Sequence, residues 1–488
     1  GRLGGRVVDR LYLSGLHKSS GKTAAAIGVA AALAEAGTPV QPFKKGPDYI
    51  DPGWLSAAAG RPCRNLDFHT MGGEEIRAAV APQGRELALI EGTKGLHDGV
   101  DPEGADSNAA LAALLEAPVV LVVDARGMTR GIAPTVLGHA RFDPQIRVAG
   151  LLLTRVGGRR PEAKLRAALA RYTDLPVLGA LPDTPALGIE MPYLGLIPAA
   201  EQREAEAAIG ALRRAVREHV DLEALRRLAE APATSATPPP AEDQPAAPAT
   251  TGGAGRGAER VRIGVAYDPA FNFYYPGDLE ALEAAGAQLC WIDTLRDAQL
   301  PPLDGLFIGG GFPERHAGAL AANRPLRAAV QEAAAGGLPV YAECGGLLYL
   351  ARRLHVGGEA YPMAGVFPVD AEMGGRPQGH GYVRLQPTGS APWSPAAEGT
   401  GPIPAHEFHY SRLRGRPAEL PCAYRIDGGA GVGDGRDGLL TANTLASYAH
   451  LRHTAATPWA ARFVEFVRRR RSAPGGDRTA GRRPERAL

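Results

Sequence analysis

The stretch Leu11-Tyr-Leu-Ser-Gly-Leu-His-Lys-Ser-Ser-Gly-Lys-Thr23 passes from an apolar β-type run through a glycine-containing turn into an alanine-rich helical segment. The backbone N–H groups of such a turn, with the N-terminus of the next helix, converge on phosphate oxygens. The spacing Gly-x5-Gly-Lys-Thr is one residue longer than the common phosphate loop. We therefore predict a nucleotide site, with a bare structural turn as the alternative, in which Lys22 neutralises the β- and γ-phosphates and Thr23 holds Mg²⁺. The loop residues concerned are Gly15, Ser20, Gly21, Lys22 and Thr23.

Length and composition place this loop in a large globular protein. A chain of 488 residues exceeds one hydrophobic core, and two domains of roughly 200–250 residues each are expected. The net charge of +2 gives no general attraction to nucleic acid. The four cysteines follow neither a disulfide nor a zinc pattern, and the chain shows neither an apolar run of 18 residues nor a signal peptide. We expect a cytoplasmic protein without nucleic-acid or membrane partners.

Residues 233–258 are rich in Pro, Ala, Thr and Gly and lack apolar periodicity, which predicts a disordered linker. The linker separates residues 1–232 from residues 259–470, and a disordered basic tail is expected at 471–488. In both halves, short apolar runs alternate with helical stretches, as in central parallel strands covered on both faces. The predicted fold class is α/β, with two doubly wound domains. The runs span 11–14, 40–43, 87–91, 119–124 and 148–154 in the first half, and 261–267, 288–292, 305–308 and 340–342 in the second.

Four acidic residues, Asp48, Asp51, Glu91 and Asp98, come directly after predicted strands of the first half. The carboxyl ends of parallel strands are where α/β sheets place their ligands. Acids beside a triphosphate serve as Mg²⁺ ligands or as hydrogen-bond acceptors for a substrate, whereas a lone Asp in a loop is more often a helix N-cap. Because four acids occur together, we favour a functional role for the set.

A thiol site is expected around Cys344, which lies in Leu338-Pro-Val-Tyr-Ala-Glu-Cys-Gly-Gly-Leu-Leu-Tyr-Leu350. The pattern predicts a sharp turn from strand to helix, in which the following N–H can stabilise an oxyanion. The loop Gly309-Gly-Gly311 offers further backbone donors, so Gly310, Gly311 and Gly345 are the oxyanion candidates. Such a nucleophile also needs a base. The candidates are His409 and His450, with His453 a weaker third; a structural histidine is the alternative for each.

Five motifs occur along the chain: Gly46-Pro-Asp-Tyr-Ile-Asp-Pro52, Glu91-Gly-x-x-Gly-Leu-x-Asp-Gly99, Gly309-Gly-Gly-Phe-Pro-Glu314, Ala342-Glu-Cys-Gly-Gly346 and His406-Glu-Phe-His-Tyr-Ser411. In this order, they resemble the motifs of the cobyrinic acid a,c-diamide synthases along nearly the whole chain. The first half is similar to dethiobiotin synthetase, which shares the long phosphate loop, and the second half is similar to the cobalamin-type class I glutamine amidotransferases.

The resemblance implies a reaction at two sites. Cys344 attacks glutamine, ammonia is released and a glutamyl thioester remains. His450 matches the family's base, His409 then serves a domain interface or the substrate side, and no third, acidic triad member is expected. At the other site, ATP phosphorylates an acetate side chain of a tetrapyrrole polycarboxylate, ammonia displaces the phosphate, and a second acetate follows.

The same resemblance assigns the acidic residues of the first half. Thr23, Asp48 and Glu91 are expected to hold Mg²⁺, and Asp48, Asp51 and Asp98 to meet the substrate or its phosphorylated intermediate. A polyanionic substrate also needs basic contacts, for which Arg64 is the first candidate, with Arg130 and Arg159 as alternatives. ATP, Mg²⁺ and L-glutamine are the implied small molecules, and we allow for a homodimer.

Some residues depart from the family pattern. Thr154 stands where relatives of dethiobiotin synthetase carry an Asn that reads adenine, and a hydroxyl cannot supply the paired donor and acceptor of an amide. Tyr193 replaces an expected His. Lys94 and the stretch Asp106-Ser-Asn-Ala-Ala110 look more like a branch that amidates siroheme in sulfur-oxidising bacteria. Cobyrinic or hydrogenobyrinic acid is therefore the first substrate hypothesis and siroheme or another sirohydrochlorin derivative the second. A non-catalytic P-loop regulator with a degenerate amidotransferase domain is a third reading.

Overall fold

A computed structural model describes residues 9–81, 84–183, 185, 199–230, 260–397, 399 and 401–472. The chain divides into two compact units, Gly1–Ala249 (unit 1) and Thr250–Leu488 (unit 2). The predicted linker at 233–258, residues 473–488 of the predicted tail, and Tyr193 lie outside the described residues. Within the described part of the chain, no helix combines the length and the apolar character needed to cross a bilayer.

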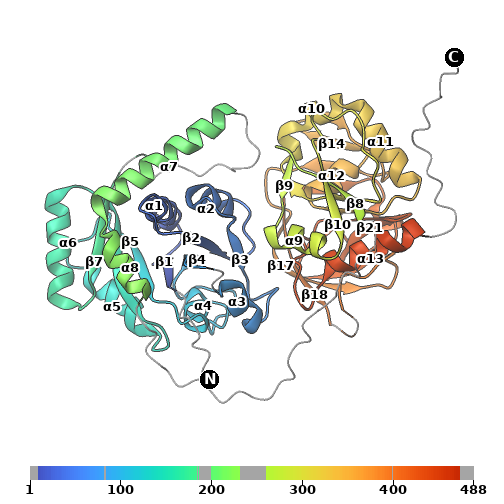
Figure 1. The fold of residues 1–488 in the computed structure, drawn as a ribbon. Helices are drawn as coiled ribbons and strands as arrows, with labels where there is room; N and C mark the ends of the chain where they lie inside the picture. Colours follow the sequence, from blue (N-terminus) through green and yellow to red (C-terminus); the bar gives the residue numbers. More distant parts are fainter. Residues whose placement is uncertain are drawn as a thin grey trace. The chain divides into compact units, whose positions relative to one another are not determined.

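Unit 1 contains a sheet with the strand order β3-β2-β4-β1-β5-β6-β7, in which every neighbouring pair is parallel (Figure 1). The predicted doubly wound α/β class is confirmed for this half. The structure adds β3 and β7 to the five predicted runs. The strands are β1 (Arg10–Gly15), β2 (Val40–Lys45), β3 (Arg64–Leu66), β4 (Leu87–Gly95), β5 (Val119–Asp124), β6 (Val148–Val156) and β7 (Val177–Pro182).

Helices cover both faces of this sheet because successive strand side chains point to opposite sides. Leu11 and Leu13 of β1 pack in one core with α1, α2, α7 and α8, whereas Tyr12 packs in the other core with α3 to α6. The carboxyl ends of the strands are left for loops and ligands. The helices are α1 (Lys22–Glu35), α2 (Asp51–Ala59), α3 (Gly73–Val80), α4 (Asn108–Leu114), α5 (Ile132–Phe142), α6 (Arg159–Tyr172), α7 (Ala199–His219) and α8 (Leu222–Glu230).

Helix α1, which follows the phosphate loop, is packed tightly against α7. A Cβ added at Gly28 would lie 2.6 Å from Val216 Cγ2 and 2.9 Å from the Leu212 carbonyl oxygen. Only glycine permits this approach, and the alanines around it are buried. The close packing holds the helix whose first residues are Lys22 and Thr23, and so positions the start of the helix at the nucleotide site.

Unit 2 contains a larger mixed sheet with the order β10-β8-β11-β13-β22-β21-β20-β17-β18. Its first five strands are parallel and its last four are joined by antiparallel pairing. The predicted α/β class is again confirmed. The strands are β8 (Val261–Ala266), β10 (Ala287–Ile292), β11 (Gly305–Ile308), β13 (Val340–Glu343), β17 (Gly379–Pro387), β18 (Ile403–His409), β20 (Cys422–Asp427), β21 (Arg436–Thr441) and β22 (Thr444–Ser447).

Sequence analysis found four of the parallel strands and missed the antiparallel half. Strands such as β17 and β20 alternate buried with exposed residues, and they contain no continuous apolar run. Two small sheets accompany the main one, with the orders β12-β9 and β15-β14-β16-β19. Their strands are β9 (Phe271–Phe273), β12 (Gly310–Gly311), β14 (Arg353–Val356), β15 (Glu359–Pro362), β16 (Asp370–Met373) and β19 (Ser411–Arg414).

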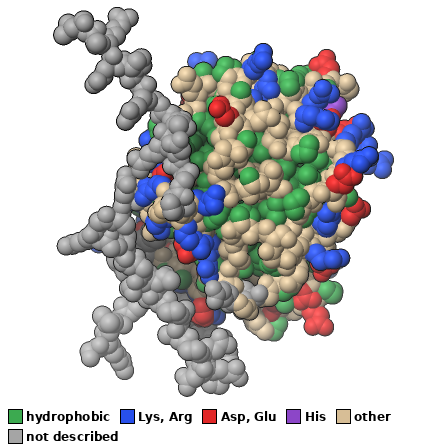
Figure 2. Space-filling view, turned by 90° about the vertical axis from the view of Figure 1, so that its right-hand side faces the viewer, with side chains coloured by type: hydrophobic (Ala, Val, Ile, Leu, Met, Phe, Trp, Pro, Cys, Tyr) green, Lys and Arg blue, Asp and Glu red, His purple; other side chains and the backbone are tan. Residues whose placement is uncertain are grey.

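Helices α9 and α13 pack with one core of unit 2, and α10, α11 and α12 pack with the other. Figure 2 shows the face of unit 2 that lies to the right in Figure 1, with most charged side chains at its rim and hydrophobic and uncharged atoms at its centre. Apolar surface of this kind is ordinary for a folded protein. The helices are α9 (Pro276–Ala284), α10 (Ala317–Ala322), α11 (Arg324–Ala335), α12 (Gly345–Leu350) and α13 (Trp459–Ser472), with 3-10 turns at Pro313–His316 and Pro417–Glu419.

The predicted boundary of the basic tail at residue 471 is corrected by the structure. Helix α13 includes the arginine run and ends at Ser472. Arg468 donates to the carbonyl oxygen of Ala285 at 3.0 Å, and Arg471 donates to that of Arg260 at 3.0 Å. Arginine favours helix formation, and cations are favourable in the last helical turn. The run therefore belongs to the folded part of unit 2.

Candidate active sites

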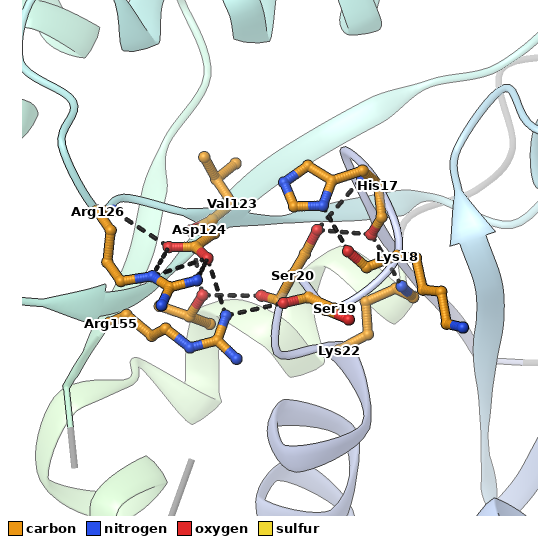
Figure 3. A network of polar contacts seen from close by, with 10 residues as sticks. His17, Lys18, Ser19, Ser20, Lys22, Val123, Asp124, Arg126 and Arg155 are labelled. Carbon is orange, nitrogen blue, oxygen red and sulfur yellow. Dashed lines mark hydrogen bonds and ion pairs between the residues drawn. The ribbon is translucent and has the colours of Figure 1, made fainter. Parts of the chain in front are cut away.

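The phosphate loop of unit 1 is closed by its own hydrogen bonds (Figure 3). The Ser20 hydroxyl donates to the carbonyl oxygen of His17 at 2.7 Å and accepts from the His17 N–H at 3.2 Å. Lys22 Nζ donates to the same carbonyl at 3.2 Å. Gly21 has a φ of 83°, a left-handed conformation that glycine adopts without cost. The structure thus brings the five predicted loop residues together between β1 and α1.

Thr154, which sequence analysis compared with a base-reading Asn, holds this loop instead. Its buried hydroxyl donates to the carbonyl oxygen of Ser20 at 2.8 Å. A Cβ at Gly21 would lie 3.3 Å from the Thr154 side chain, so the two residues are in close contact. The hydroxyl proton is committed to the loop backbone, which gives Thr154 a positioning role.

Arg155, next along β6, binds the preceding carbonyl of the loop. Its Nη1 donates to the Ser19 carbonyl oxygen at 2.8 Å and to Asp124 Oδ2 at 2.9 Å. Asp124 ends β5 and also pairs with Arg126 at 2.7 Å (Figure 3). Burial alone would raise the pKa of Asp124, but hydrogen bonds from Arg126 and the charges of Arg126 and Arg155 lower it. Two consecutive residues of β6 therefore hold two consecutive carbonyls of the phosphate loop.

A buried cluster of one lysine and two carboxylates lies at the ends of β2 and β4. Lys44 Nζ is 2.6 Å from Asp51 Oδ2 and 3.0 Å from Glu91 Oε1, and it donates to the Gly92 carbonyl oxygen at 3.3 Å. Thr23 of the phosphate loop donates to Glu91 Oε1 at 2.6 Å. Lys44 was missed by sequence analysis as a site residue, although it directly follows a predicted strand in a Lys-Lys-Gly-Pro-Asp stretch.

The charges in this cluster interact strongly. Burial raises the pKa of Glu91 to about 7, while Lys44 opposes that shift. Burial alone would lower the pKa of Lys44, but Glu91 and Asp51 raise it well above its ordinary value. Burial and the charge of Lys44 lower the pKa of Lys22 to about 8. Lys44 therefore remains charged as the counterion of the two carboxylates.

Other predicted residues lie around this cluster. The Asp48 carboxylate accepts from the N–H groups of Ile50 at 2.7 Å and Asp51 at 3.1 Å, as in a helix cap before α2. Burial, with the nearby charge of Asp51, raises the pKa of Asp48. Asp98 is exposed and accepts from the Gly95 N–H at 2.9 Å, and half-buried Arg64 begins β3.

The oxygen donors at the cluster fit Mg²⁺, which prefers carboxylates, hydroxyls and phosphate oxygens. Among the described residues, Glu91 Oε2 is buried without a hydrogen-bond partner, while Glu91 Oε1 and the Thr23 hydroxyl are adjacent. The described residues contain no group of three or more His, Cys, Asp or Glu side chains that could by itself hold a metal ion. Thr23 and Glu91 are the residues that would hold Mg²⁺ with a nucleotide, whereas Asp48, predicted as a third ligand, accepts the backbone N–H groups of Ile50 and Asp51.

In unit 2, Cys344 occupies a strained turn between β13 and α12. Its φ of 46° and ψ of −99° are rare for a residue with a side chain and are typical of a nucleophile elbow. A Cβ at Gly346 would lie 2.2 Å from the Ile308 carbonyl oxygen, and one at Gly345 would lie 3.0 Å from Gly311 N. The elbow therefore packs on the glycine loop, with Gly345 N–H and Gly311 N–H on neighbouring backbone segments.

His450 reaches the thiol from the end of β22, which pairs with β13. The Cys344 N–H donates to the Ser447 carbonyl oxygen at 2.7 Å. Three residues after Ser447, the His450 N–H donates to the His406 carbonyl oxygen at 2.8 Å. Burial lowers the pKa of His450, but hydrogen bonds with Cys344 and Glu343 outweigh burial and raise it to about 10. Such an imidazole is suited to hold the proton of a thiolate–imidazolium pair.

An acidic residue, contrary to expectation, also reaches His450. Glu343 Oε2 lies 3.5 Å from His450 Nδ1, and both side chains are buried. Sequence analysis missed Glu343, for which the only signal was its position directly before Cys344. Buried Asp437, also missed, accepts from the N–H groups of Tyr448 at 3.0 Å and Ala449 at 2.9 Å, and so holds the segment that carries His450.

The other two candidate histidines have different partners. His409 Nδ1 contacts the Ser411 carbonyl oxygen at 2.8 Å, and Nε2 contacts Glu407 Oε2 at 3.3 Å. Both ring nitrogens of His409 are therefore occupied within the protein. His453 Nδ1 accepts from the Ala460 N–H at 3.3 Å, and burial, reinforced by Arg452, lowers its pKa to about 4. Contacts of this kind are typical of structural histidines, and a catalytic role for either residue stays a prediction.

Two family models match the chain. One, described as the CobQ/CobB/MinD/ParA nucleotide binding domain, matches residues 17–191, and the other, the CobB/CobQ-like glutamine amidotransferase domain, matches residues 262–457. The chain is 43% identical to a cobyrinate a,c-diamide synthase of Magnetococcus marinus, over 95% of this chain and 98% of that protein. It is 36% identical to a protein of the same name from Methanosarcina acetivorans, over 94% and 95% of the two chains. A relative of that name from Methanothermobacter thermautotrophicus is 38% identical, over 93% and 98%. The chain belongs to the family of cobyrinate a,c-diamide synthases.

Proposed function

We propose that the chain uses ATP and glutamine to amidate the a and c acetate side chains of cobyrinic or hydrogenobyrinic acid. The observation that supports the proposal is that one chain carries the residues of two candidate reaction centres. Unit 2 holds the strained Cys344 beside His450, and unit 1 holds the phosphate loop beside the Lys44 cluster. The relatives named cobyrinate a,c-diamide synthase match both units along nearly their whole length.

In unit 2, the thiolate of Cys344 attacks the side-chain carboxamide carbon of glutamine while His450 holds the proton. The N–H groups of Gly345 and Gly311 face the oxyanion that forms. As the C–N bond breaks, His450 gives its proton to the leaving nitrogen, and ammonia departs. The glutamyl thioester left on Cys344 is then hydrolysed by water, which restores the thiol and releases glutamate.

In unit 1, the residues of the phosphate loop bind ATP. An acetate carboxylate of the macrocycle accepts the γ-phosphoryl group, because an acyl phosphate has a better leaving group than a free carboxylate. Lys22 and Lys44 offset the charge that develops on the transferred group. Mg²⁺, when bound by Thr23 and Glu91, supplies further charge neutralisation there. Ammonia then attacks the acyl carbon and phosphate leaves, which forms the amide.

Asp51, Asp48 and Asp98 are assigned to the substrate side of this centre, and Arg64 to an acetate or propionate of the macrocycle. Siroheme or another sirohydrochlorin derivative is the second candidate substrate, because Lys94 and the stretch 106–110 resemble the siroheme branch. Asp106 of that stretch accepts from the N–H groups of Val100 at 2.9 Å and Asp101 at 3.0 Å, so its side chain holds the loop. The relatives named cobyrinate a,c-diamide synthase support a corrinoid precursor as the first candidate.

The test pairs purified protein, ATP, Mg²⁺ and glutamine with cobyrinic acid, hydrogenobyrinic acid and siroheme in turn. We expect product from a corrinoid precursor whose mass shows two oxygens replaced by two NH groups. Cys344→Ser should abolish glutamine-dependent product while ammonium salts restore it, and Cys290→Ser, at a half-exposed cysteine, should leave both activities intact. Amidation of siroheme alone would overturn the substrate assignment. The absence of both glutaminase and ATP-dependent ligase activity would favour a regulator instead.

A further inference from the structure

Glu343 is buried beside the thiol with both carboxylate oxygens engaged. Oε1 accepts from the Tyr341 hydroxyl at 2.5 Å and from the Leu451 N–H at 2.9 Å, whereas Oε2 faces His450 Nδ1 at 3.5 Å. The residue is 3% exposed. Because a carboxylate removed from water needs partners for its charge, these contacts indicate that its orientation is set by the surrounding structure.

The strand register explains how one carboxylate meets both the strand and the histidine. Tyr341 and Glu343 are two residues apart on β13, so their side chains point to the same face. Glu343 pairs in register with Ser447 of β22, and the chain continues from Ser447 to His450 and Leu451 over that face. The carboxylate therefore joins the strand that ends at Cys344 to the segment that carries His450.

The groups facing His450 come from several elements. Cys344 and Glu343 belong to the end of β13, and the ring of His406 on β18 stacks on His450 with centroids 4.9 Å apart. Asp278 of α9 is directed elsewhere, since it accepts from Trp459 Nε1 and from the His453 N–H, each at 2.9 Å.

Two residues after His450 the chain carries Arg452, a cation rather than an acid. Arg452 lies over the ring of Tyr275 and 3.9 Å from Asp278. The acidic partner of the imidazole thus comes from the residue before the nucleophile, not from the residues that follow the histidine.

We propose that Glu343 is a positioning residue of the glutaminase centre, where it orients the imidazole of His450 and stabilises its protonated form. With Nδ1 turned to Glu343, Nε2 is the nitrogen available to Cys344. A carboxylate at Nδ1 favours imidazolium over imidazole, and so favours the thiolate–imidazolium pair over the neutral pair. The described partners of the Glu343 carboxylate are Tyr341, Leu451 and His450, so it acts on the thiol through His450. This inference rests on the proposed use of Cys344 as a nucleophile toward glutamine.

The test compares Glu343→Gln with the wild-type protein in the full chain. The substitution keeps the size of the side chain and removes its charge. We expect kcat for glutamine hydrolysis to fall at least about tenfold with little change in KM, because Glu343 acts through His450 and does not bind glutamine. The alkaline limb of the pH profile of kcat/KM should move to lower pH, because the imidazolium loses a stabilising charge. Ammonia-dependent amidation by unit 1 should be unchanged and so reports an intact chain.

A second measurement does not depend on glutaminase activity. The rate of alkylation of Cys344 by iodoacetamide, followed by mass spectrometry of the peptide that contains it, reports the thiolate. In Glu343→Gln this rate should be below the wild-type rate near pH 7 and should approach it at high pH, where the thiol ionises without the histidine. If the two proteins differ in alkylation as expected but the wild-type protein hydrolyses no glutamine, the proposed function is contradicted. The effect of Glu343 on the Cys344–His450 pair is then still supported.

Asp268→Asn is the matched control, since Asp268 is a buried carboxylate of the same unit that accepts from the backbone N–H groups of Ala270 at 2.8 Å and Thr294 at 2.6 Å. It should change stability without moving the alkaline limb. Glu343→Asp is the second variant and serves if Glu343→Gln fails to fold. It keeps the charge but shortens the side chain by one methylene, so kcat should fall while the limb moves less than in Glu343→Gln, or stays near wild type. A wild-type pH profile in Glu343→Gln, or identical behaviour of Glu343→Gln and Asp268→Asn, would overturn the proposal, as would a glutaminase kcat in Glu343→Asp equal to that of the wild-type protein.

Discussion

Lys44 and Glu91 meet at 3.0 Å across the neighbouring strands β2 and β4, and both side chains are almost completely removed from solvent. The same lysine lies 2.6 Å from Asp51. A buried charge is tolerated only when it is paired, so the lysine and the two carboxylates stabilise one another. This relationship places a fixed cation where the proposed phosphoryl transfer needs positive charge.

Removal of that cation should make unit 1 dependent on added metal. Lys44→Met leaves buried Glu91 and half-buried Asp51 without their counterion, which we expect to cost about 3–5 kcal/mol of stability. Mg²⁺ should then raise the thermal unfolding temperature of the variant more than that of the wild-type protein. Differential scanning calorimetry with and without MgCl₂ measures this difference, and ATP-dependent amidation with ammonia should be lost.

Lys45→Met provides the control for the lysine experiment. Lys45 is the next residue of β2 and points to the opposite face, and burial lowers its pKa, so a charge there is less favourable. We expect this variant to show the wild-type response to Mg²⁺. An equal response of Lys44→Met and the wild-type protein would contradict the counterion role of Lys44.

The hydroxyl of Thr154 should affect ATP affinity. Thr154→Val keeps the shape of the side chain and removes the hydrogen bond to the Ser20 carbonyl oxygen, worth about 1 kcal/mol, so KM for ATP should rise about fivefold. Thr154→Ser should retain the wild-type KM, and glutaminase activity should be unchanged in both variants. Steady-state kinetics with ATP measure this effect, and an unchanged KM for ATP in Thr154→Val would contradict the positioning role.

The close approach of Gly310 to His450 leads to a steric prediction. A Cβ at Gly310 would lie 2.6 Å from His450 Cε1, so Gly310→Ala must displace the imidazole from Cys344. We expect glutaminase kcat to fall at least about tenfold while ammonia-dependent amidation persists. Gly375→Ala is the control, since a Cβ there meets no atom within 4 Å. Full glutaminase activity in Gly310→Ala would show that His450 does not need its observed position.

A pH effect on stability is expected from Asp278. Burial raises its pKa to about 7, with Arg452 opposing the shift, whereas the unfolded chain should titrate near 3.9. The folded state therefore binds this proton more tightly, and the stability it contributes is complete below about pH 4 and is lost as pH rises to about 7. As pH rises over that window, the stability of the wild-type protein should fall relative to that of Asp278→Asn.

Thermal unfolding of unit 2 at several pH values measures this difference, with a slope of up to about 1.4 kcal/mol per pH unit. Asp304→Asn, at a half-exposed carboxylate of the same unit, serves as the reference substitution. A difference between wild type and Asp278→Asn that stays constant from pH 4 to pH 7 would contradict the shifted titration.

Features of this protein that depend on neighbouring residues in the sequence were predictable, and features that depend on distant residues were not. The α/β class of both halves followed from short apolar runs, and the elbow around Cys344 and the loop before Lys22 followed from local patterns of glycine. The role of Lys44 depends on Glu91, 47 positions later, and the contact of Glu343 with His450 depends on the register of β13 and β22. Neither register nor side-chain partner is encoded in one short stretch.

The missed antiparallel strands and the arginine run show two further limits. Strands with one half-exposed face alternate polar and apolar residues, a weaker signal than the continuous runs of the parallel strands. Arg471 was predicted to begin the disordered tail, yet it lies in α13 and donates to the Arg260 carbonyl oxygen at 3.0 Å. Its role depends on where the helix packs.

The order in which the glutaminase centre is completed has a consequence during synthesis on the ribosome. Cys344 is translated about a hundred residues before His450, and α13, whose Trp459 and Phe463 lie in the core beneath the sheet, follows later still. A nascent or prematurely terminated polypeptide that ends before β22 carries an ordinary thiol with no imidazole to hold its proton. If Cys344 and His450 act as proposed, unfinished chains should not hydrolyse glutamine.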